Sequence, residues 1–410
     1  MNNKKNMNNK KISSCRICNT SEFSSILDLG LQSFTGVFVH HGLSVEKAPL
    51  ELIKCDNCGL FQLAHDFNPE MMYGDSYGYR SSQNTWMVNH LKNSVIEMSK
   101  NLNDDDLVIE IGSNDATSLS FFPDTCRKIG VDPSAKPLRD KYLKGCQLIP
   151  EFFTSSVVKN ILSNHGKARV IMSFAMFYDL PDPVEFAKNI SKILGEDGIW
   201  VFEQSYLLSM LEAGSFDTIC HEHLEYYTLK DVERILSLAG LRVIDVSLNE
   251  SNGGSFKVTA THQHGNLKTS ENVELFRNNE MRDHNRKLLE DFLTKVNNVK
   301  KYVRVLLSDC QKKGLTVYGI GASTKGNVLL QYCNLTKADI KAVGEINSEK
   351  FGKECPGTGI PIIKESEVLS DPNGVFLILP WHFRDFFINS NKFNLKRIVF
   401  PLPKWEEINV

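Results

Sequence analysis

The stretch 107–132 constrains the fold of this chain more than any other. An apolar run with a single acid, Leu107–Ile111, is typical of a buried parallel strand. A Gly-Ser-Asn-Asp turn follows, then a segment that can begin a helix, 116–122, and a second short strand, 128–131, which ends at Asp132. This order predicts the first half of a doubly wound α/β sheet.

A nucleoside ligand fits the end of such a strand. Glycine lets the backbone approach the ligand, a helix N-terminus offers free N–H groups, and an acid after the second strand can bond both ribose hydroxyls. NAD requires further glycines where this chain has polar side chains, which suit a cationic sulfonium with an amino-acid tail. We therefore expect S-adenosylmethionine, against an NAD-type cofactor or a ligand-free turn. The residues expected to bind it are Glu110, Gly112, Asn114, Asp115, Asp132, Ser134 and Phe174.

Composition narrows the class of protein. A chain of 410 residues is expected to form two to three domains, and 41% hydrophobic with 23% charged residues is typical of a soluble globular protein. The net charge of −2 predicts no general attraction to nucleic acid or membrane, and no apolar run reaches the roughly 18 residues of a membrane helix. Residues 1–12 are predicted to be a disordered tail, and the scattered cysteines fit a reducing cytoplasm.

Two C-x-x-C pairs predict a metal site near the N-terminus. The pair Cys15 and Cys18 is separated from the pair Cys55 and Cys58 by 36 residues, enough for a small sheet. Four thiolates can form a closed tetrahedral shell, which indicates structural rather than catalytic Zn²⁺. Disulfides, a redox pair or a nucleic-acid-binding ribbon are the alternatives, and the last lacks a dense basic and aromatic face.

A tyrosine-rich loop precedes a predicted helix around 86–98. Tyr77 and Tyr79 stand among small residues in 73–82. Such side chains could line a sugar site or only anchor the loop on the core.

The stretch 216–227 has the highest density of side chains that could take part in catalysis. His221 and His223 flank Glu222, and at positions i and i+2 they cannot share one face of a helix, although on a strand or loop they could face one way. A His–Glu pair can act as a general base, against a polar loop whose histidines bond only to backbone. Cys220 could be a nucleophile, but buried unreactive cysteine is commoner.

The alternation of strand and helix continues along the chain. Strands are predicted at 169–174 and 198–204, so that one sheet extends from about 100 to 265. Apolar residues at steps of three and four predict a long amphipathic helix within 271–313 that packs on a domain. Further strands are predicted at 315–318 and 340–343.

The last hundred residues repeat the strand–glycine–helix theme. The loop 319–326 has small residues, a hydroxyl and a lysine at a helix start, which can cradle a diphosphate or serve only as a structural loop. The turn 252–254 allows close ligand approach or only a tight hairpin. The candidate substrate-binding residues are Asn252, Gly319, Gly321, Ser323, Lys325 and Glu345.

These motifs in this order resemble the nucleotide-sugar C-methyltransferases of bacterial deoxysugar pathways. The resemblance runs from Cys15 to about Pro403 and includes E-I-G-S-N-D, H-E-H, N-G-G-S, G-I-G-A-S-T-K-G and P-G-T-G-I-P-I. It implies a base that removes a proton beside a 4-keto group, so that the enolate carbon attacks the sulfonium methyl. His223 matches that base, Glu222 its companion acid, and Tyr77 or Tyr79 the tyrosine loop.

The family pattern differs from this chain at two positions that would face the sugar. Tyrosine is usual where this chain has Cys220, and histidine is usual near Asp179. O-methylation of a related nucleotide sugar is therefore the alternative reaction, and a zinc-ribbon binding module is the alternative without catalysis. We expect no nucleic-acid or membrane partner and a monomer or weak dimer.

The fold predicted from these observations is α/β, with a class I methyltransferase doubly wound sheet between two smaller units. The expected domains are a tail at 1–12, a zinc-binding domain at 13–75, a methyltransferase domain at 76–265, and a long helix plus Rossmann-like nucleotide-sugar-binding domain at 266–410.

Overall fold

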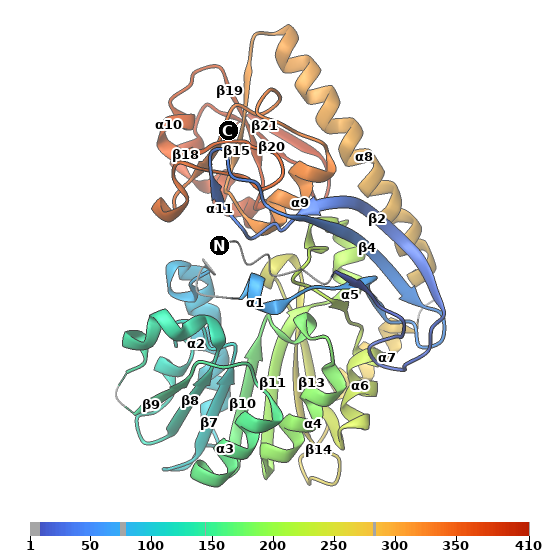
Figure 1. Ribbon diagram of the computed structural model, residues 1–410, viewed down its shortest axis with the longest axis vertical. Coiled ribbons are helices and arrows are strands. Elements are labelled where there is room, and N and C mark those ends of the chain that lie inside the picture. Colours follow the sequence, from blue (N-terminus) through green and yellow to red (C-terminus); the bar gives the residue numbers. More distant parts are fainter. Residues whose placement is uncertain (1–8, 74–78, 144, 282–283, 410) are drawn as a thin grey trace, which may run out of the picture.

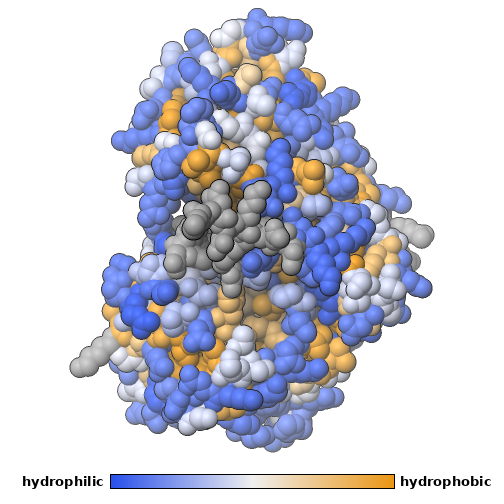
Figure 2. Space-filling model, viewed as in Figure 1, coloured by the Kyte–Doolittle hydropathy of each residue, from blue (hydrophilic) through white to orange (hydrophobic). Residues whose placement is uncertain are grey.

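Three larger sheets, each built mostly from a different part of the chain, organise the fold (Figure 1). The structure is a computed structural model that describes residues 9–73, 79–143, 145–281 and 284–409. In the view of Figure 1 the central sheet lies in the lower half and the C-terminal sheet in the upper half, with the N-terminal strands between them on the side of α8. In the same view the left edge of the molecule is indented where the two halves meet (Figure 2).

The central sheet has seven strands in the order β13-β14-β11-β10-β7-β8-β9, and all are parallel except β14. Every residue of β7 is buried, as expected for a strand covered on both faces. This confirms the predicted doubly wound sheet. The strands are β7 (Leu107–Ile111), β8 (Arg127–Val131), β9 (Cys146–Ile149), β10 (Ala168–Phe174), β11 (Leu194–Ser205), β13 (Leu241–Asn249) and β14 (Ser255–His262).

Helices connect and cover the strands of this sheet. Pro183 begins α4 at its first turn, where proline is tolerated, and the Asp182 side chain accepts the N–H of Glu185 there. Thr228 and Asp231 form a capping box at the start of α6. The helices are α2 (Thr85–Ser99), α3 (Ser155–His165), α4 (Pro183–Ile193), α5 (Leu207–Ala213), α6 (Leu229–Leu238) and α7 (Glu271–Glu280).

The helix predicted after the first central strand is absent. Only a short 3₁₀ turn, η2 (Leu119–Phe121), forms within 116–122. Asn114 and Ala116 have φ angles of 48° and 59°, and Pro123 follows the 3₁₀ turn, so the backbone cannot continue into an α-helix. The turn after β7 therefore ends in irregular backbone rather than at a helix N-terminus.

The N-terminal sheet is antiparallel, in the order β12-β5-β4-β2, and it borrows a strand from the central part of the chain. The pairing of β12 with β5 attaches this sheet to the stretch that follows His223. Its strands are β2 (Phe23–Ser33), β4 (Lys47–Cys55), β5 (Phe61–Leu63) and β12 (Glu225–Tyr226). Shorter elements are β1 (Lys10–Lys11), which pairs with β6 (His65–Asp66), and α1 (Pro69–Met72).

The C-terminal sheet has the order β18-β16-β15-β19-β20-β21, parallel except for β21. Numbered along the chain this is 3-2-1-4-5-6, the order of dinucleotide-binding folds, which confirms the Rossmann-like prediction. The strand predicted at 340–343 is only partly correct, because β16 begins at Val343. The strands are β15 (Thr316–Ile320), β16 (Val343–Glu345), β18 (Ile362–Lys364), β19 (Gly374–Ile378), β20 (Arg397–Phe400) and β21 (Glu406–Asn409).

The helical stretch predicted within 271–313 forms two helices. The first, α7, packs on β13 of the central sheet, whereas the second, α8 (His284–Lys312), runs along the outside of the molecule (Figure 1). The apolar residues of α8 from Phe292 to Cys310 at steps of three and four are buried, as predicted. No helix within the described residues is long and apolar enough to cross a bilayer. The C-terminal half also contains α9 (Thr324–Tyr332), α10 (Glu365–Leu369), α11 (Arg384–Asn389) and β17 (Lys353–Glu354), which pairs with β3 (Val39–His40).

Candidate functional site

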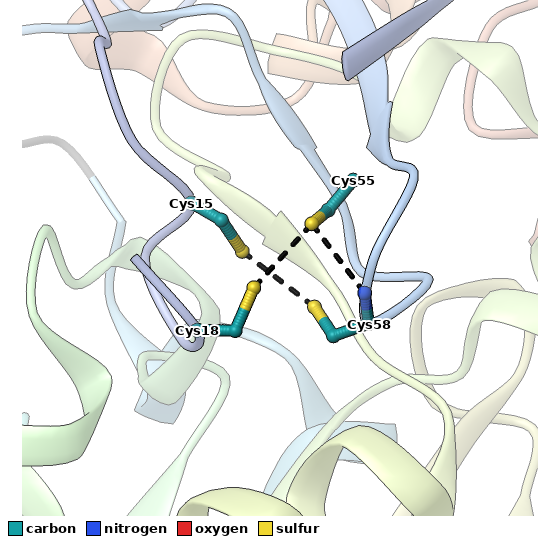
Figure 3. Close-up of side chains that lie close together, drawn as sticks. All are labelled: Cys15, Cys18, Cys55 and Cys58. Atoms are coloured by element: carbon teal, nitrogen blue, oxygen red, sulfur yellow. Dashed lines mark hydrogen bonds between the residues drawn. The ribbon is translucent and has the colours of Figure 1, made fainter. Parts of the chain in front are cut away.

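Four cysteines from two separate turns converge in the N-terminal domain, with their sulfur atoms facing one another (Figure 3). Cys15 Sγ lies 3.6 Å from Cys58 Sγ, Cys18 Sγ lies 3.5 Å from Cys55 Sγ, and all four sulfurs lie within 4.8 Å of one another. A tetrahedral zinc ion with Zn–S bonds of about 2.3 Å requires sulfur separations of about 3.8 Å. The four thiols therefore fit a closed zinc shell.

The two C-x-x-C pairs form matching turns. In each, the carbonyl of the first cysteine accepts the N–H of the residue four positions later, at 3.0 Å from Asn19 and 2.9 Å from Gly59. Both of these residues have positive φ, 60° and 91°, a conformation that asparagine and glycine tolerate best. The hydrogen bond between the Cys15 and Cys58 thiols lowers the pKa of Cys15 and raises that of Cys58, so the two thiols share one proton in the absence of metal.

The turn after β7 closes against the end of β8. Gly112 has a φ of 76°, and its N–H donates to the Val131 carbonyl at 2.9 Å. A Cβ on Gly112 would lie 3.2 Å from Met176 Cγ, so both conformation and space favour glycine. The Asp132 carboxylate accepts the N–H of Asn114 at 2.8 Å. The expected turn and acid therefore meet at the edge of the sheet where ligands bind in this fold.

Asn114 and Asp115, whose side chains are expected to contact the cofactor tail, form hydrogen bonds to the segment 79–82 in this structure. Asn114 Oδ1 accepts the N–H of Ser81 at 3.2 Å, and its Nδ2 donates to the Tyr79 carbonyl at 3.0 Å. Asp115 Oδ2 accepts the N–H of Ser82 at 3.0 Å. The end of the tyrosine loop is thus hydrogen-bonded to the turn after β7.

The other expected cofactor residues lie around the same edge. Glu110 is buried in β7, where the Ser118 hydroxyl donates to it, and burial raises its pKa to about 8. Asp132 accepts both the N–H and the hydroxyl of Ser134 at 2.7 Å. Phe174 ends β10 and is half-buried.

Sequence reasoning missed a polar cluster at this edge. Glu203, near the end of β11, accepts from His90 Nε2 at 2.8 Å and from Asn249 Nδ2 at 2.8 Å. The His90 ring stacks on Trp86 with ring centroids 5.1 Å apart. Because β11 pairs with β10 so that Glu203 lies opposite Phe174, this cluster borders the expected cofactor edge. An acid at the end of an apolar strand was the signal that could have found it.

The two histidines of the H-E-H stretch point to different neighbours, so the expectation that both rings face one way is wrong. His221 is fully buried between Phe34 and Phe67, with ring centroids 4.6 Å and 4.8 Å away, and its Nε2 lies 3.4 Å from the Ala48 carbonyl. Burial lowers its pKa to about 4. His221 therefore belongs to the core of the N-terminal sheet.

His223 is half-buried and keeps one nitrogen available. Its Nδ1 lies 2.8 Å from the Thr218 carbonyl, and a carbonyl can only accept, so Nδ1 carries the hydrogen. The lone pair of the neutral ring then lies on Nε2. Burial, with the charge of Lys325 as a smaller contribution, lowers the pKa of His223 to about 4. His223 is thus neutral near pH 7 and able to accept a proton.

Two half-buried carboxyl groups, Glu222 and Asp179, lie near this base. Thr35 Oγ1 donates to Glu222 at 3.5 Å, and a Cβ on Gly36 would lie 3.0 Å from Glu222 Oε1, so the N-terminal domain borders this acid. The Tyr73 hydroxyl donates to Asp179 at 2.8 Å. Burial raises the pKa of Glu222 and, together with the nearby charge of Glu222, that of Asp179. Burial therefore shifts both acids toward the protonated form.

The structure describes only part of the tyrosine loop. Tyr77 lies outside the described residues, and Tyr79 is 44% exposed. Tyr73, which sequence reasoning did not single out, is the described tyrosine of this loop whose hydroxyl reaches a buried acid. Cys220 is fully buried, and burial raises its pKa well above the ordinary value, as expected for an unreactive thiol.

The loop after β15 repeats the arrangement seen after β7. Gly321 has a φ of 82°, and the N–H of Ala322 donates to the Glu345 carboxylate at 2.9 Å. Ser323 caps α9 by accepting the N–H of Gly326 at 3.0 Å. A pocket of about 560 Å³ borders Glu345 at the carboxyl ends of β16 and β18. These groups could hold a nucleoside.

The other candidate substrate residues lie elsewhere. Gly319 is inside β15, where a Cβ would lie 3.0 Å from Val343 Cγ2, so it serves sheet packing. Lys325 does not lie along its own loop: its Nζ donates to the carbonyl of Asn252 at 2.6 Å, across the junction with the central domain.

Three family models match successive parts of the chain. They are "Putative zinc binding domain" over residues 15–73, "Methyltransferase domain" over 84–246 and "C-methyltransferase C-terminal domain" over 250–403. The C-methyltransferase NovU of Streptomyces niveus is 29% identical over 411 residues, which cover 96% of each chain. These matches confirm the resemblance to C-methyltransferases and agree with S-adenosylmethionine and zinc as the groups that this chain binds.

Solved methyltransferase structures match part of this chain at low similarity. A SAM-dependent methyltransferase from Anabaena variabilis is 15% identical, with a TM-score of 0.35 over 47% of this chain and 87% of that chain. The N-methyltransferase NodS from Bradyrhizobium japonicum is 11% identical, with a TM-score of 0.33 over 44% of this chain and 98% of that chain.

Proposed function

We propose that this chain, an S-adenosylmethionine-dependent C-methyltransferase by its domains, methylates a carbon beside the keto group of a nucleotide-linked sugar. The observation that carries the proposal is His223. Its Nδ1–H is held by the Thr218 carbonyl, and its half-buried ring keeps a free Nε2 lone pair at neutral pH. Removal of a proton from carbon requires a base in its unprotonated form.

The reaction begins with proton transfer to the protein. His223 Nε2 takes a proton from the carbon next to the carbonyl, the C–H electron pair forms a C=C bond, and the carbonyl π electrons move to oxygen. The other candidate catalytic residues are His221, Glu222 and the tyrosine loop with Tyr77 and Tyr79. Of these, Glu222 can donate a hydrogen bond beside the base when it is protonated. S-adenosylmethionine, when bound, supplies a methyl group whose bond to sulfur breaks as the new carbon–carbon bond forms.

The C-terminal Rossmann-like domain is assigned to the nucleotide of the substrate. Gly321, Ser323 and Glu345 surround the loop after β15, and the neighbouring pocket of about 560 Å³ is large enough for a base and ribose. S-adenosylmethionine is assigned to the carboxyl-terminal edge of the central sheet. The residues proposed to bind it are Glu110, Gly112, Asn114, Asp115, Asp132, Ser134 and Phe174.

Mass spectrometry tests the acceptor class. The protein is mixed with S-adenosylmethionine and a panel of uridine- and thymidine-diphosphate ketosugars, and we expect a gain of one methyl group on at least one of them. Exchange of the substrate C–H with deuterated solvent, without cofactor, then separates the two reactions. Deuterium uptake supports the enolate, and methylation without uptake would assign O-methylation instead.

His223→Ala tests the base. We expect turnover to fall by roughly 10²- to 10⁴-fold, as for loss of a general base, while S-adenosylmethionine binding measured by calorimetry stays unchanged. His264→Ala is the matched control, because His264 is exposed and its ring contacts Glu196 and His262, away from His223 in the sequence. Full activity of the His223 variant would refute the proposed base.

A further inference from the structure

The side chain of Lys325 extends out of the C-terminal domain. It stands in the first turn of α9, yet its Nζ donates to the Asn252 carbonyl in the turn before β14. The side chain therefore crosses from the C-terminal domain to the central domain, and it is half-buried there. An ammonium has three donors, so Asn252 occupies one of them.

No ion pair links Lys325 to a carboxylate among the described residues. Asp217 is the acid whose charge it feels most, but no ion pair joins the two: Asp217 Oδ2 accepts from the indole N–H of Trp381 at 2.8 Å, and its buried Oδ1 has no hydrogen-bond partner. Burial without a direct counter-ion is costly for a cation, and it lowers the pKa of Lys325. Such a charge is stabilised only when an anion comes near it.

The charge of Lys325 also reaches the base. After burial, it is among the causes that lower the pKa of His223 and of His382, so the three groups share one electrostatic site. His382 borders Gly253, next to the carbonyl that Lys325 contacts. Lys325 lies on α9, which packs on η5 (Phe216–Thr218), and the Thr218 carbonyl of η5 holds the His223 ring. Lys325 and His223 thus come from different domains and both border this contact.

We propose that the Lys325 ammonium binds the keto oxygen of the acceptor and stabilises the oxyanion that forms when His223 removes the proton. This inference rests on the proposed function. When the proton moves to His223 Nε2, the negative charge appears on oxygen, and a cation fixed beside it lowers the barrier without further reorganisation. The negative charge of the enolate oxygen then offsets the repulsion between the protonated base and the cation. No co-reactant is needed for this step.

The contact geometry separates this role from diphosphate binding. A lysine that held a diphosphate would lie along the loop 319–323, whereas Lys325 Nζ lies at the Asn252 carbonyl.

Lys325→Met tests the proposal in the full-length protein. We expect solvent exchange of the C–H beside the ketone, in a uridine- or thymidine-diphosphate 4-keto-6-deoxyhexose, to fall by about 10²- to 10³-fold at saturating sugar. Binding of the free nucleoside diphosphate and of S-adenosylmethionine should stay unchanged by calorimetry. The acid limb of the exchange rate should move to higher pH, because Lys325 lowers the pKa of His223. Lys341→Met, which removes an exposed cation of the same domain, is the matched control.

The outcomes distinguish the two proposals. Exchange by Lys325→Met at the wild-type rate would overturn the role of Lys325 and leave the proposed function intact. Weaker binding of the free diphosphate with normal exchange at saturation would also overturn it, in favour of diphosphate binding. Absence of exchange in the wild-type protein across the panel would overturn the enolate mechanism itself.

Discussion

At the scale of single residues, burial sets the protonation of both the base and the cofactor edge. It lowers the pKa of His223 to about 4 and raises that of Glu110 to about 8, so each group is held in its neutral form near pH 7. For His223, one further contact decides the chemistry. The Thr218 carbonyl selects the tautomer, and the free nitrogen becomes the one that can accept a proton.

Glu110→Gln should show how the raised pKa affects stability. In the unfolded chain this acid has the ordinary glutamate pKa of 4.5, whereas in the folded protein its pKa is raised to about 8. Between these values the folded state binds more protons, so this group lowers stability as pH rises. We expect the free energy of unfolding of Glu110→Gln to rise relative to wild type from pH 6 to 8, at up to about 1.4 kcal/mol per pH unit, and the apparent Tm to rise with it. Glu151→Gln, at an exposed site, is the control, and a constant difference for Glu110→Gln across pH would contradict the expectation.

At the scale of elements, one device occurs twice. An acid at the end of the second strand accepts a backbone N–H of the loop after the first strand, Asp132 from Asn114 at 2.8 Å and Glu345 from Ala322 at 2.9 Å. In both loops a glycine with positive φ precedes the bonded residue. The carboxylates hold the loops open at the ends of β7 and β15, where ligands bind in such sheets.

The paired cysteine turns give a prediction at the same scale. Cys18→Ser should bind less than a full equivalent of zinc per chain, because a hydroxyl is a poor substitute for the fourth thiolate, and the N-terminal sheet should lose stability with it. Zinc content by mass spectrometry and the apparent Tm report the two effects. Cys146→Ser lies outside the cluster and serves as control. Full zinc content in Cys18→Ser would exclude this thiol as a ligand.

At the scale of the whole molecule, the N-terminal domain joins the other two. β12 comes from the central part of the chain and completes the N-terminal sheet, while β3 pairs with β17 of the C-terminal part. The backbone of Ser33 exchanges two hydrogen bonds with the Gln331 side chain, at 2.7 Å and 3.2 Å, and Asn327 donates to the Thr35 carbonyl at 2.7 Å. This clasp places Thr35 and Gly36 against Glu222.

Gln331→Ala should loosen that clasp. It leaves the buried backbone of Ser33 without its partner, which costs about 1–3 kcal/mol. We expect hydrogen exchange at residues 33–35 to accelerate by roughly ten- to a hundredfold, while exchange in β7 and β10 stays unchanged. Gln311→Ala, at an exposed site at the end of α8, is the control. Unchanged protection at residues 33–35 would show that Gln331 does not hold this segment in place.

What the sequence by itself determined were the features that depend on neighbours along the chain. The cysteine spacing predicted the thiol cluster, apolar runs predicted β7, β10, β11 and β15, and steps of three and four predicted the buried face of α8. The family resemblance assigned His223 as the base, a role that stays a prediction. These signals are local, because a turn, a strand or a helix face is specified by residues close together in the chain.

Only the tertiary structure decided which distant groups share a site. It separated His221 from His223, replaced the helix expected at 116–122 by irregular backbone, and paired His90 with Glu203 across 113 residues. It also carried Lys325 out of its loop to the central domain. The physical reason is that burial, tautomer and charge at a site are set by whichever side chains the fold brings together, and most of these are far away in the sequence.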